Sequence, residues 1–471
     1  MSIAIDDLKA KFEAQKMAFS RDSSPTLEER LMRIERLSSM LSENREKFHS
    51  ALAKDFNAHP ARLVDLMETG PVIARVAYYV EQLQHWLAPR VEEMGPAHGS
   101  SRGEVVHMAK GVCGNISPWN FPVESALVMC VDMLAAGNRV IIKPSELAPA
   151  TAALLDELIA KYFDPTLLTV TQGGEELGEA FSAMPWDHLT FTGSPRVGKL
   201  VLKAAAENMV PVTLELGGKN PAVFAKDGVT DELVSLFLSF RTLKSGQVCT
   251  SPDHVLVPDA QLDTWIASAR TFWAQVYPNY VGHKDMTGII NEAHYNRLMS
   301  YIDEAREVGA RVISLNGDVA DPFRRQIPLT LIINPPDDLG CMVDEIFGPI
   351  IPVITYAEID KVFEKINKGP SPLASYLVTH DEELAQKFIA TVRSGGAAIN
   401  NFGVQGGHVT LPFGGFGSSG QGCHSGMEGF YNYTHAKSVF YGEADSFVHK
   451  ALTPPLQKST TSNDLNAKDL E

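Results

Sequence analysis

The feature that most constrains the fold is a regular alternation of short apolar runs and longer helix-like stretches between residues 112 and 216. The strand-like runs are 112–117, 139–143, 168–172, 188–191 and 211–216. Strands that alternate with helices of this length form a parallel sheet with helices on both faces. We therefore predict a doubly wound α/β domain, in which ligands bind at the carboxyl ends of the strands.

The rest of the chain is predicted to add helices, a hairpin and a second α/β region. Residues 27–48 repeat apolar side chains near the helical period, and Thr26 with Glu29 forms a capping-box pattern. A second helix is predicted over residues 63–86. Residues 90–110 are short, Gly-interrupted and β-like, which indicates a hairpin. Strand-like and helix-like stretches return between 212 and 402. A chain of 471 residues is expected to form two or three domains.

Composition excludes several classes of protein. The formal net charge of −16 argues against non-specific nucleic-acid binding, which needs a basic face. The five cysteines are scattered and include no CxxC pair, so we expect no disulfide framework and no metal site, and a reducing, cytoplasmic compartment. No run of about 18 apolar residues is present, so no membrane span is expected.

Cys249 is the candidate nucleophile. It lies between a helix-like run, 233–240, and a strand-like run, 254–257, where a thiol can be held at the floor of a cleft. A nucleophilic thiolate must be partly exposed and have a pKa lowered by backbone amides or positive charge. The alternative is a buried structural thiol, and Cys113 and Cys130 fit that alternative better because they lie in apolar patterns.

Glu215 and Asn120 are candidate partners of the thiol. Glu215 interrupts the apolar run 212–216, and burial there would raise its pKa toward the range of a general base. It could instead be a strand-end carboxylate turned to water. Asn120 lies between Pro118 and Pro122, so its amide could be held rigidly and donate to an oxyanion. The alternative is a tight turn around a packed tryptophan.

Two further segments suggest a bound dinucleotide. Gly193 and Ser194 end a strand just before Pro195, and a helix N-terminus after such a turn can bind a pyrophosphate. The usual GxGxxG pattern is absent, so an ordinary βα turn is an equal alternative. Lys143 and Glu146 follow another strand and could bind ribose hydroxyls, or be solvated loop charges.

Taken together, these motifs resemble the aldehyde dehydrogenase superfamily over residues 20–445. The resemblance is carried, in order, by segments 118–122, 143–146, 191–194, 215–221, 246–249, 345–349 and 412–415. The segment 408–415 is similar to the shorter class-3 branch, and within it to enzymes of coniferyl and related aromatic or fatty aldehydes. One such motif is weak evidence, whereas seven in order are specific.

The resemblance implies a role for each site residue. Cys249 attacks the aldehyde, Asn120 holds the oxyanion, and Glu215 activates the water that releases the acid. The implied cofactor residues are Lys143, Glu146, Gly193, Ser194, Glu345 and Phe347, and the implied substrate-pocket residues are Phe121 and Phe413. Glu146 should repel a 2′-phosphate, so NAD is expected to be favoured, with NADP tolerated.

The resemblance also implies the domain organisation and a homodimer. We expect a dinucleotide-binding domain of residues 1–87 and 111–210 and a catalytic domain of residues 211–402. An oligomerisation element would comprise 88–110 and 403–448, and 449–471 would be a flexible tail. The expected reaction is oxidation of an aromatic or medium- to long-chain aldehyde to its acid. Two alternatives are a CoA-acylating dehydrogenase and a non-catalytic dinucleotide-binding protein.

Overall fold

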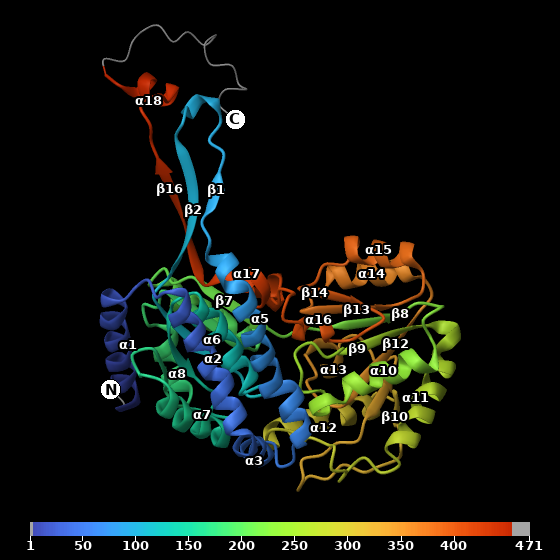
Figure 1. The fold of residues 1–471 in the computed structure, drawn as a ribbon. Coiled ribbons are helices and arrows are strands. Elements are labelled where there is room, and N and C mark those ends of the chain that lie inside the picture. The colour runs from blue at the N-terminus through green and yellow to red at the C-terminus, as the bar shows by residue number, and fades with distance from the viewer. Residues whose placement is uncertain (1–2, 455–471) are drawn as a thin grey trace.

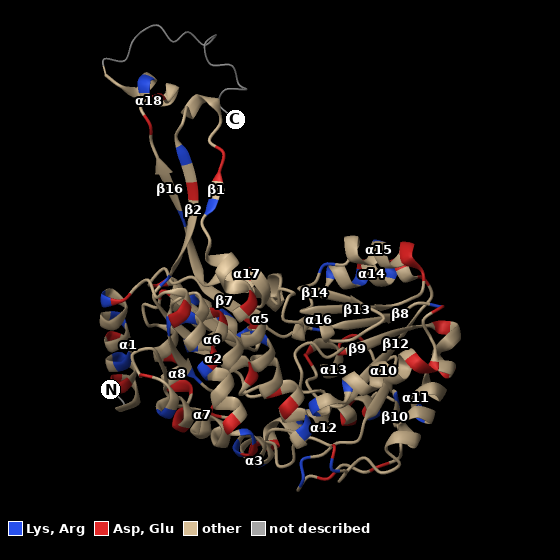
Figure 2. Ribbon diagram, viewed as in Figure 1, with Lys and Arg blue, Asp and Glu red and all other residues tan. Residues whose placement is uncertain are grey.

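The structure is a computed structural model that describes residues 3–454. Two α/β units lie side by side, and a narrow three-stranded sheet extends away from them (Figure 1). Lys and Arg are interspersed with Asp and Glu over both units (Figure 2). In the described residues, no helix is long and apolar enough to cross a membrane.

The first unit is built on a six-stranded sheet that confirms the predicted doubly wound fold. Its strand order is β15-β7-β6-β3-β4-β5, and every neighbouring pair is parallel except β15 with β7. The strands are β3 (Val112–Ile116), β4 (Arg139–Lys143), β5 (Leu168–Val170), β6 (His188–Gly193), β7 (Val212–Leu216) and β15 (Gly420–Gln421). The chain order reverses between β3 and β6, and ligands of doubly wound sheets bind at the carboxyl ends of the strands at such a switch point.

Helices cover both faces of this sheet. One core joins the sheet to α2 (Leu27–Glu43), α3 (Arg45–Asp55), α5 (Gly70–Leu87), α6 (Glu124–Ala135) and α7 (Pro149–Tyr162). A second core, on the other face, includes α1 (Ile3–Arg21), α8 (Glu175–Ser182) and α9 (Pro195–Ala206). The sheet is therefore buried on both sides, as its continuous apolar strands predict.

Two helices predicted as continuous are interrupted. The capping box of Thr26 and Glu29 is present, but α2 ends at Glu43 because Asn44 turns its side-chain amide back to the Met40 carbonyl. The predicted helix 63–86 is divided into α4 (Ala61–Val64), a π-helical turn (Asp65–Thr69) and α5. Such π-turns occur frequently at functional sites.

The second unit contains a seven-stranded sheet in the order β10-β11-β12-β9-β8-β13-β14. Only β10 with β11 is antiparallel. The strands are β8 (Pro221–Phe224), β9 (His254–Pro258), β10 (Arg311–Ser314), β11 (Thr330–Ile333), β12 (Ile350–Tyr356), β13 (Ala374–Val378) and β14 (Gly396–Ile399). The helices are α10 (Asp231–Arg241), α11 (Leu262–Val276), α12 (Glu292–Glu307), α13 (Gly340–Val343), α14 (Ile359–Lys368) and α15 (Glu382–Thr391).

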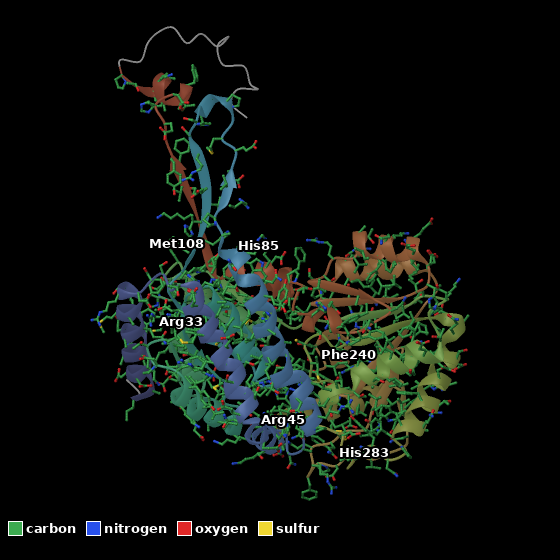
Figure 3. The ribbon with its side chains drawn as sticks, viewed as in Figure 1. Arg33, Arg45, His85, Met108, Phe240 and His283 are labelled. Carbon is green, nitrogen blue, oxygen red and sulfur yellow. The ribbon has the colours of Figure 1, made fainter. Side chains whose placement is uncertain are left out.

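The extended sheet joins the predicted hairpin to the end of the chain. β2 (Arg102–Ala109) is its central strand, with β1 (Arg90–Glu92) and β16 (Thr434–Tyr441) antiparallel on either side. Met108 lies at the base of this arm, where it meets the first unit (Figure 3). A short helix, α18 (Phe447–Leu452), follows β16 near the tip (Figure 1).

The structure divides the chain at somewhat different positions from the expected domains. β7 and β15 belong to the first sheet, so that unit extends to residue 216 and includes part of the C-terminal segment. α16 (Val404–Gly407) and α17 (Gly426–Asn432) lie with the two α/β units. Of the described C-terminal segment, only β16 and α18 belong to the arm. Of the expected tail, 449–452 are helical, and 455–471 lie outside the described residues.

Candidate active site

The segment that carries Cys249 crosses from α10 to β9 through an unusual backbone turn. Lys244 and Ser245 have φ values of 50° and 55°, and Gly246 follows at 76°. Three successive left-handed residues reverse the chain sharply, at a cost that the surrounding contacts must offset. The Asn220 amide fixes the far side of this turn by donating to the carbonyl oxygens of Cys249, at 2.7 Å, and Ser251, at 3.0 Å.

Arg241 connects this turn to the segment that carries Glu345. Its buried guanidinium donates to the carbonyl oxygens of Gly348 and Ile350, the latter at 2.8 Å. A Cβ on Gly246 would lie 2.0 Å from the Arg241 guanidinium and 2.5 Å from the Gly348 oxygen. Gly246 is therefore required both for its φ and for this close approach.

Cys249 is half-buried, which agrees with the predicted position of a nucleophile. Its electrostatics differ from the expectation of a lowered pKa. Burial raises the pKa of the thiol, and the carboxyl groups of Glu345, Glu124 and Glu215 raise it further, although a hydrogen bond with the Thr250 backbone opposes them. A thiol whose pKa is raised attacks a carbonyl only when its proton is transferred to an acceptor.

Glu215 is buried in β7, with a side chain only 3% exposed. Its neighbours in the sheet are Thr192 of β6 and Gly420 of β15. Neither carboxyl oxygen has a hydrogen-bond partner, and burial, followed by the field of Glu124, raises its pKa well above 4.5. The alternative of a carboxylate turned to water is therefore wrong, and the environment suits a general base.

Asn120 lies beside the nucleophile segment. Its side chain is buried, and its Nδ2 donates to the carbonyl oxygen of Gln247, two residues before Cys249, at 3.2 Å. The amide thus reaches the residues that immediately precede the thiol. A fixed amide donor in a buried site is the type of group that stabilises an oxyanion.

Four of the predicted cofactor residues lie at the ends of β4 and β6, the two strands that flank β3. The buried Lys143 donates to the exposed Glu146 carboxylate at 3.1 Å. Ser194 caps α9, since its Oγ accepts from the Val197 N–H at 3.4 Å. Gly193 precedes this helix, and a Cβ there would lie 2.6 Å from the Phe191 ring. A helix N-terminus and an exposed carboxylate therefore lie at the ends of strands on either side of β3, an arrangement of the kind that binds a dinucleotide.

Glu345 and Phe347 approach the site from the second unit. A Cβ on Gly217 would lie 1.9 Å from the Glu345 carboxyl oxygen, so the glycine permits this approach. Burial raises the pKa of Glu345 to about 8, with a contribution from Asp253. Phe347 adopts a φ of 54°, and its ring stands perpendicular to that of Trp119 at 5.3 Å.

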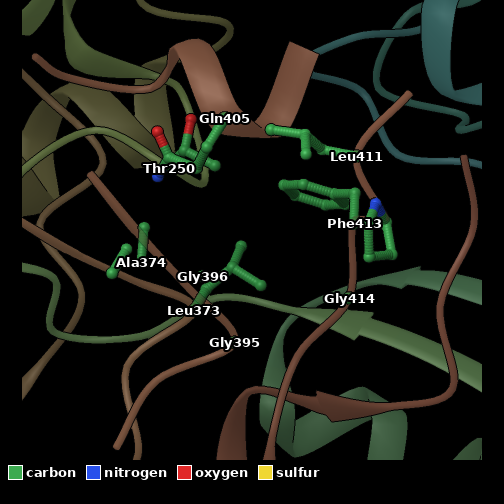
Figure 4. Close-up of a pocket in the computed structure, with 11 residues that line it drawn as sticks. Thr250, Leu373, Ala374, Gly395, Gly396, Gln405, Leu411, Phe413 and Gly414 are labelled. Carbon is green, nitrogen blue, oxygen red and sulfur yellow. The ribbon is translucent and has the colours of Figure 1, made fainter. Parts of the chain in front are cut away.

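The two predicted pocket residues lie in different surroundings. Phe413 lines a cavity of about 180 Å³ together with Leu411, Leu373 and Thr250, the residue that follows Cys249. Figure 4 shows Phe413 and Leu411 on one side of this cavity. Phe121 is not part of the cavity lining; its ring packs against the Lys244 ammonium at 3.9 Å.

Several residues of the site were not predicted from the sequence. Lys244, Glu68 and Arg241 are charged and fully or almost fully buried, and Glu124 acts electrostatically on both Cys249 and Glu215. The one sequence signal for Lys244 is its position, because a charged residue five positions before the candidate nucleophile Cys249 is unusual. In residues 3–454, no group of three or more His, Cys, Asp or Glu side chains is placed to hold a metal ion.

Comparison with known proteins agrees with this geometry. The model of the aldehyde dehydrogenase family matches residues 3–439. Coniferyl aldehyde dehydrogenase from a Pseudomonas species is 38% identical over 93% of this chain and 91% of its own. Aldehyde dehydrogenase family 3 member H1 from Arabidopsis thaliana is 34% identical over 85% and 83%.

Solved structures give the same result. The substrate-bound AldH of Staphylococcus aureus is 30% identical, with a TM-score of 0.89 over 94% of this chain and 95% of that one. A Mycobacterium tuberculosis aldehyde dehydrogenase complexed with NAD⁺ is 28% identical, with a TM-score of 0.82 over 92% and 90%. The chain belongs to the aldehyde dehydrogenase family, and it is an aldehyde-oxidising enzyme that uses a nicotinamide dinucleotide.

Proposed function

We propose that the chain oxidises an aromatic, coniferyl-type aldehyde, or a medium- to long-chain one, to its carboxylic acid through a thioester on Cys249. The observation that carries this proposal is Glu215. It is a buried carboxyl group with no hydrogen-bond partner and a raised pKa, and it interacts electrostatically with the half-buried thiol of Cys249. A nucleophile and a base that interact electrostatically suit a two-step acyl transfer.

In the first step, the Cys249 sulfur bonds to the aldehyde carbon, and the thiol proton passes to solvent water. Asn120 donates its amide N–H to the oxygen that gains negative charge. A bound nicotinamide dinucleotide would supply the acceptor for the hydride of the aldehyde carbon. Glu345 and Phe347 would hold the nicotinamide half, while Lys143, Glu146, Gly193 and Ser194 would hold the adenosine and diphosphate half.

In the second step, Glu215 removes a proton from water, which attacks the thioester carbon and releases the carboxylic acid. The carbon–sulfur bond breaks, and the sulfur leaves as a thiolate that regains a proton. The desolvated position of Glu215 favours this hydrolysis over transfer to CoA, because a base of raised pKa is suited to activating water. It also favours an active enzyme over a non-catalytic dinucleotide-binding protein.

A panel of aldehydes tests the substrate class. The cavity beside Thr250 is lined by Phe413, Leu411 and Leu373, so its walls fit an apolar substrate. We expect kcat/KM to be higher for aromatic and long-chain aldehydes than for short, charged ones. We also expect Phe413→Ala to lower kcat/KM for the aromatic substrates by roughly tenfold, equivalent to about 1.4 kcal/mol of lost ring contact. A preference for short, charged aldehydes would overturn the assignment.

We propose NAD as the preferred cofactor. The Glu146 carboxylate is exposed and pairs with Lys143 beside the predicted ribose site, where a 2′-phosphate would be repelled. We expect Glu146→Gln to raise the ratio of kcat/KM with NADP to that with NAD. Steady-state kinetics with both cofactors checks this expectation. An unchanged ratio would show that Glu146 does not determine the cofactor preference.

We further propose a cytoplasmic homodimer joined through the arm. All five cysteines are free, as expected in a reducing compartment. The arm exposes apolar side chains of β16 and its neighbours, including Val91 at 63% and Phe440 at 52%, and an isolated narrow sheet of this kind is marginally stable. Sedimentation equilibrium should give twice the 51.4 kDa chain mass, and a monomer at micromolar concentration would contradict the proposal.

A further inference from the structure

A completely buried ion pair lies behind the nucleophile. The side chains of Lys244 and Glu68 are both 0% exposed, and the Lys244 ammonium donates to the Glu68 carboxylate. The rings of Phe121, at 3.9 Å, and Phe56, at 5.5 Å, surround the ammonium. Burying two charges is costly even when they are paired, so a contribution to folding stability does not account for this ion pair.

The pair joins three segments that are distant in sequence. Glu68 lies on the π-helical turn before α5, and its second oxygen accepts the backbone N–H groups of Val123, at 3.1 Å, and Glu124, at 3.0 Å. Lys244 lies in the left-handed turn five residues before Cys249. The pair therefore connects the helical layer, the first turn of α6 and the nucleophile segment.

Lys244 also holds Asn120 directly. Its ammonium donates to the Asn120 carbonyl oxygen at 2.6 Å. The Asn120 backbone is thus held from one side by Lys244, while its side-chain amide reaches the Gln247 carbonyl on the other. Three residues further on, Glu68 holds the backbone N–H of Val123. The Asn120 segment is fixed by the ion pair at two points.

We infer that the Glu68–Lys244 pair is a positioning device that fixes the Asn120 amide relative to the Cys249 sulfur. This inference rests on the proposed function, in which Asn120 donates to the oxyanion. Neither charged group touches the substrate. Both act through the Asn120 segment, and a donor displaced by about 1 Å loses much of its effect on the transition state.

The test removes both charges together, so that neither is left buried without its partner. We expect the double variant Glu68→Gln/Lys244→Met to lower kcat/KM for the aldehyde, at saturating NAD⁺, by roughly 10- to 100-fold. Asn120→Ala should lower it by roughly 10²- to 10³-fold. If the pair acts through Asn120, the triple variant will match Asn120→Ala alone within about threefold, since coupled residues are not additive. Multiplied losses, or a double variant with the wild-type kcat/KM, would overturn the inference.

A second readout separates positioning from a change in thiol acidity. The Lys244 ammonium also interacts with Cys249, so the pair could instead tune the thiol. We expect the pH profile of Cys249 alkylation by iodoacetamide, and the affinity for NAD⁺, to be the same in the double variant and the wild type. A shifted alkylation profile would contradict a role through Asn120.

The control is a surface ion pair between α3 and the same π-helical turn. Arg45 donates to Asp65 at 2.7 Å on the outer surface of the first unit (Figure 3), and Arg45→Met/Asp65→Asn should leave kcat/KM within about twofold of the wild type. If the main variant unfolds, the neutral pair Glu68→Gln/Lys244→Gln, which keeps side chains that can hydrogen-bond and leaves no buried charge, should give a smaller loss in the same direction. An inactive wild type would refute the proposed function, whereas a loss confined to Asn120→Ala would refute only the inference.

Discussion

Replacing Cys249 by alanine is expected to abolish aldehyde-dependent NADH formation, with kcat lowered by roughly 10⁴-fold or more. The proposed mechanism forms the thioester on this sulfur alone, so the variant should also lose the rapid first turnover. Absorbance of NADH in stopped-flow and steady-state assays measures both effects. Binding of NAD⁺, measured by fluorescence quenching, should be retained.

Cys423 is the matched control for this substitution. It is also half-buried and interacts electrostatically with Glu215, and burial raises its pKa to about 11. Because no proposed step uses its sulfur, Cys423→Ala should keep kcat within about threefold of the wild type. Substantial activity in Cys249→Ala, combined with loss of activity in Cys423→Ala, would show that Cys423 is the nucleophile and that Cys249 is not.

Replacing Glu215 by glutamine is expected to separate the two chemical steps. Acylation does not need this base, so one equivalent of NADH per active site should still form rapidly. Hydrolysis of the thioester does need it, so steady-state turnover should fall by roughly 10²- to 10⁴-fold. Stopped-flow measurement of the burst and of the rate that follows distinguishes these steps.

The same variant distinguishes hydrolysis from transfer to CoA. If CoA resolved the thioester, adding CoA would restore turnover in Glu215→Gln and yield an acyl-CoA product. We expect free acid as the product in the wild type, with or without CoA, and no rescue of the variant. Formation of acyl-CoA by the wild type would assign the chain to the CoA-acylating class.

The raised pKa of Glu215 also predicts the pH dependence of turnover. The base acts in its ionised form, so steady-state hydrolysis should be slow at low pH and rise as pH increases through this raised pKa. That rise should disappear from the steady-state rate of Glu215→Gln. The burst should keep its own increase with pH, because the Cys249 thiol also has a raised pKa.

Much of the fold could be predicted because its strands are local, continuous apolar runs. All five predicted strands of the first sheet are present, and β3 and β4 are buried at every position. The breaks at Asn44 and at the π-helical turn could not be predicted, since they depend on one side chain and on tertiary packing. The place of β15 in the first sheet is a contact across about 200 residues, between Gly420 and Glu215, which no local pattern contains.

A site residue could be predicted from the sequence only where its residue type is unusual for its position. Glu215 stands out because a carboxyl group interrupts an apolar strand, and the structure confirms its burial. Glu68, in contrast, lies in a sequence context typical of an ordinary polar helix residue, yet its side chain is completely buried against Lys244. The raised pKa of Cys249 arises first from burial and then from three carboxyl groups brought together by the fold, so neither its direction nor its cause could be derived from neighbouring residues in the sequence.

Mass spectrometry of quenched Glu215→Gln enzyme tests the central claim most directly. After mixing with aldehyde and NAD⁺, the intact protein should gain the mass of one acyl group, and digestion should place that group on the peptide containing Cys249. The wild type, under the same quench, should carry much less of it because hydrolysis removes it. An unmodified variant that has formed one equivalent of NADH, or an acyl group on another residue, would contradict the account.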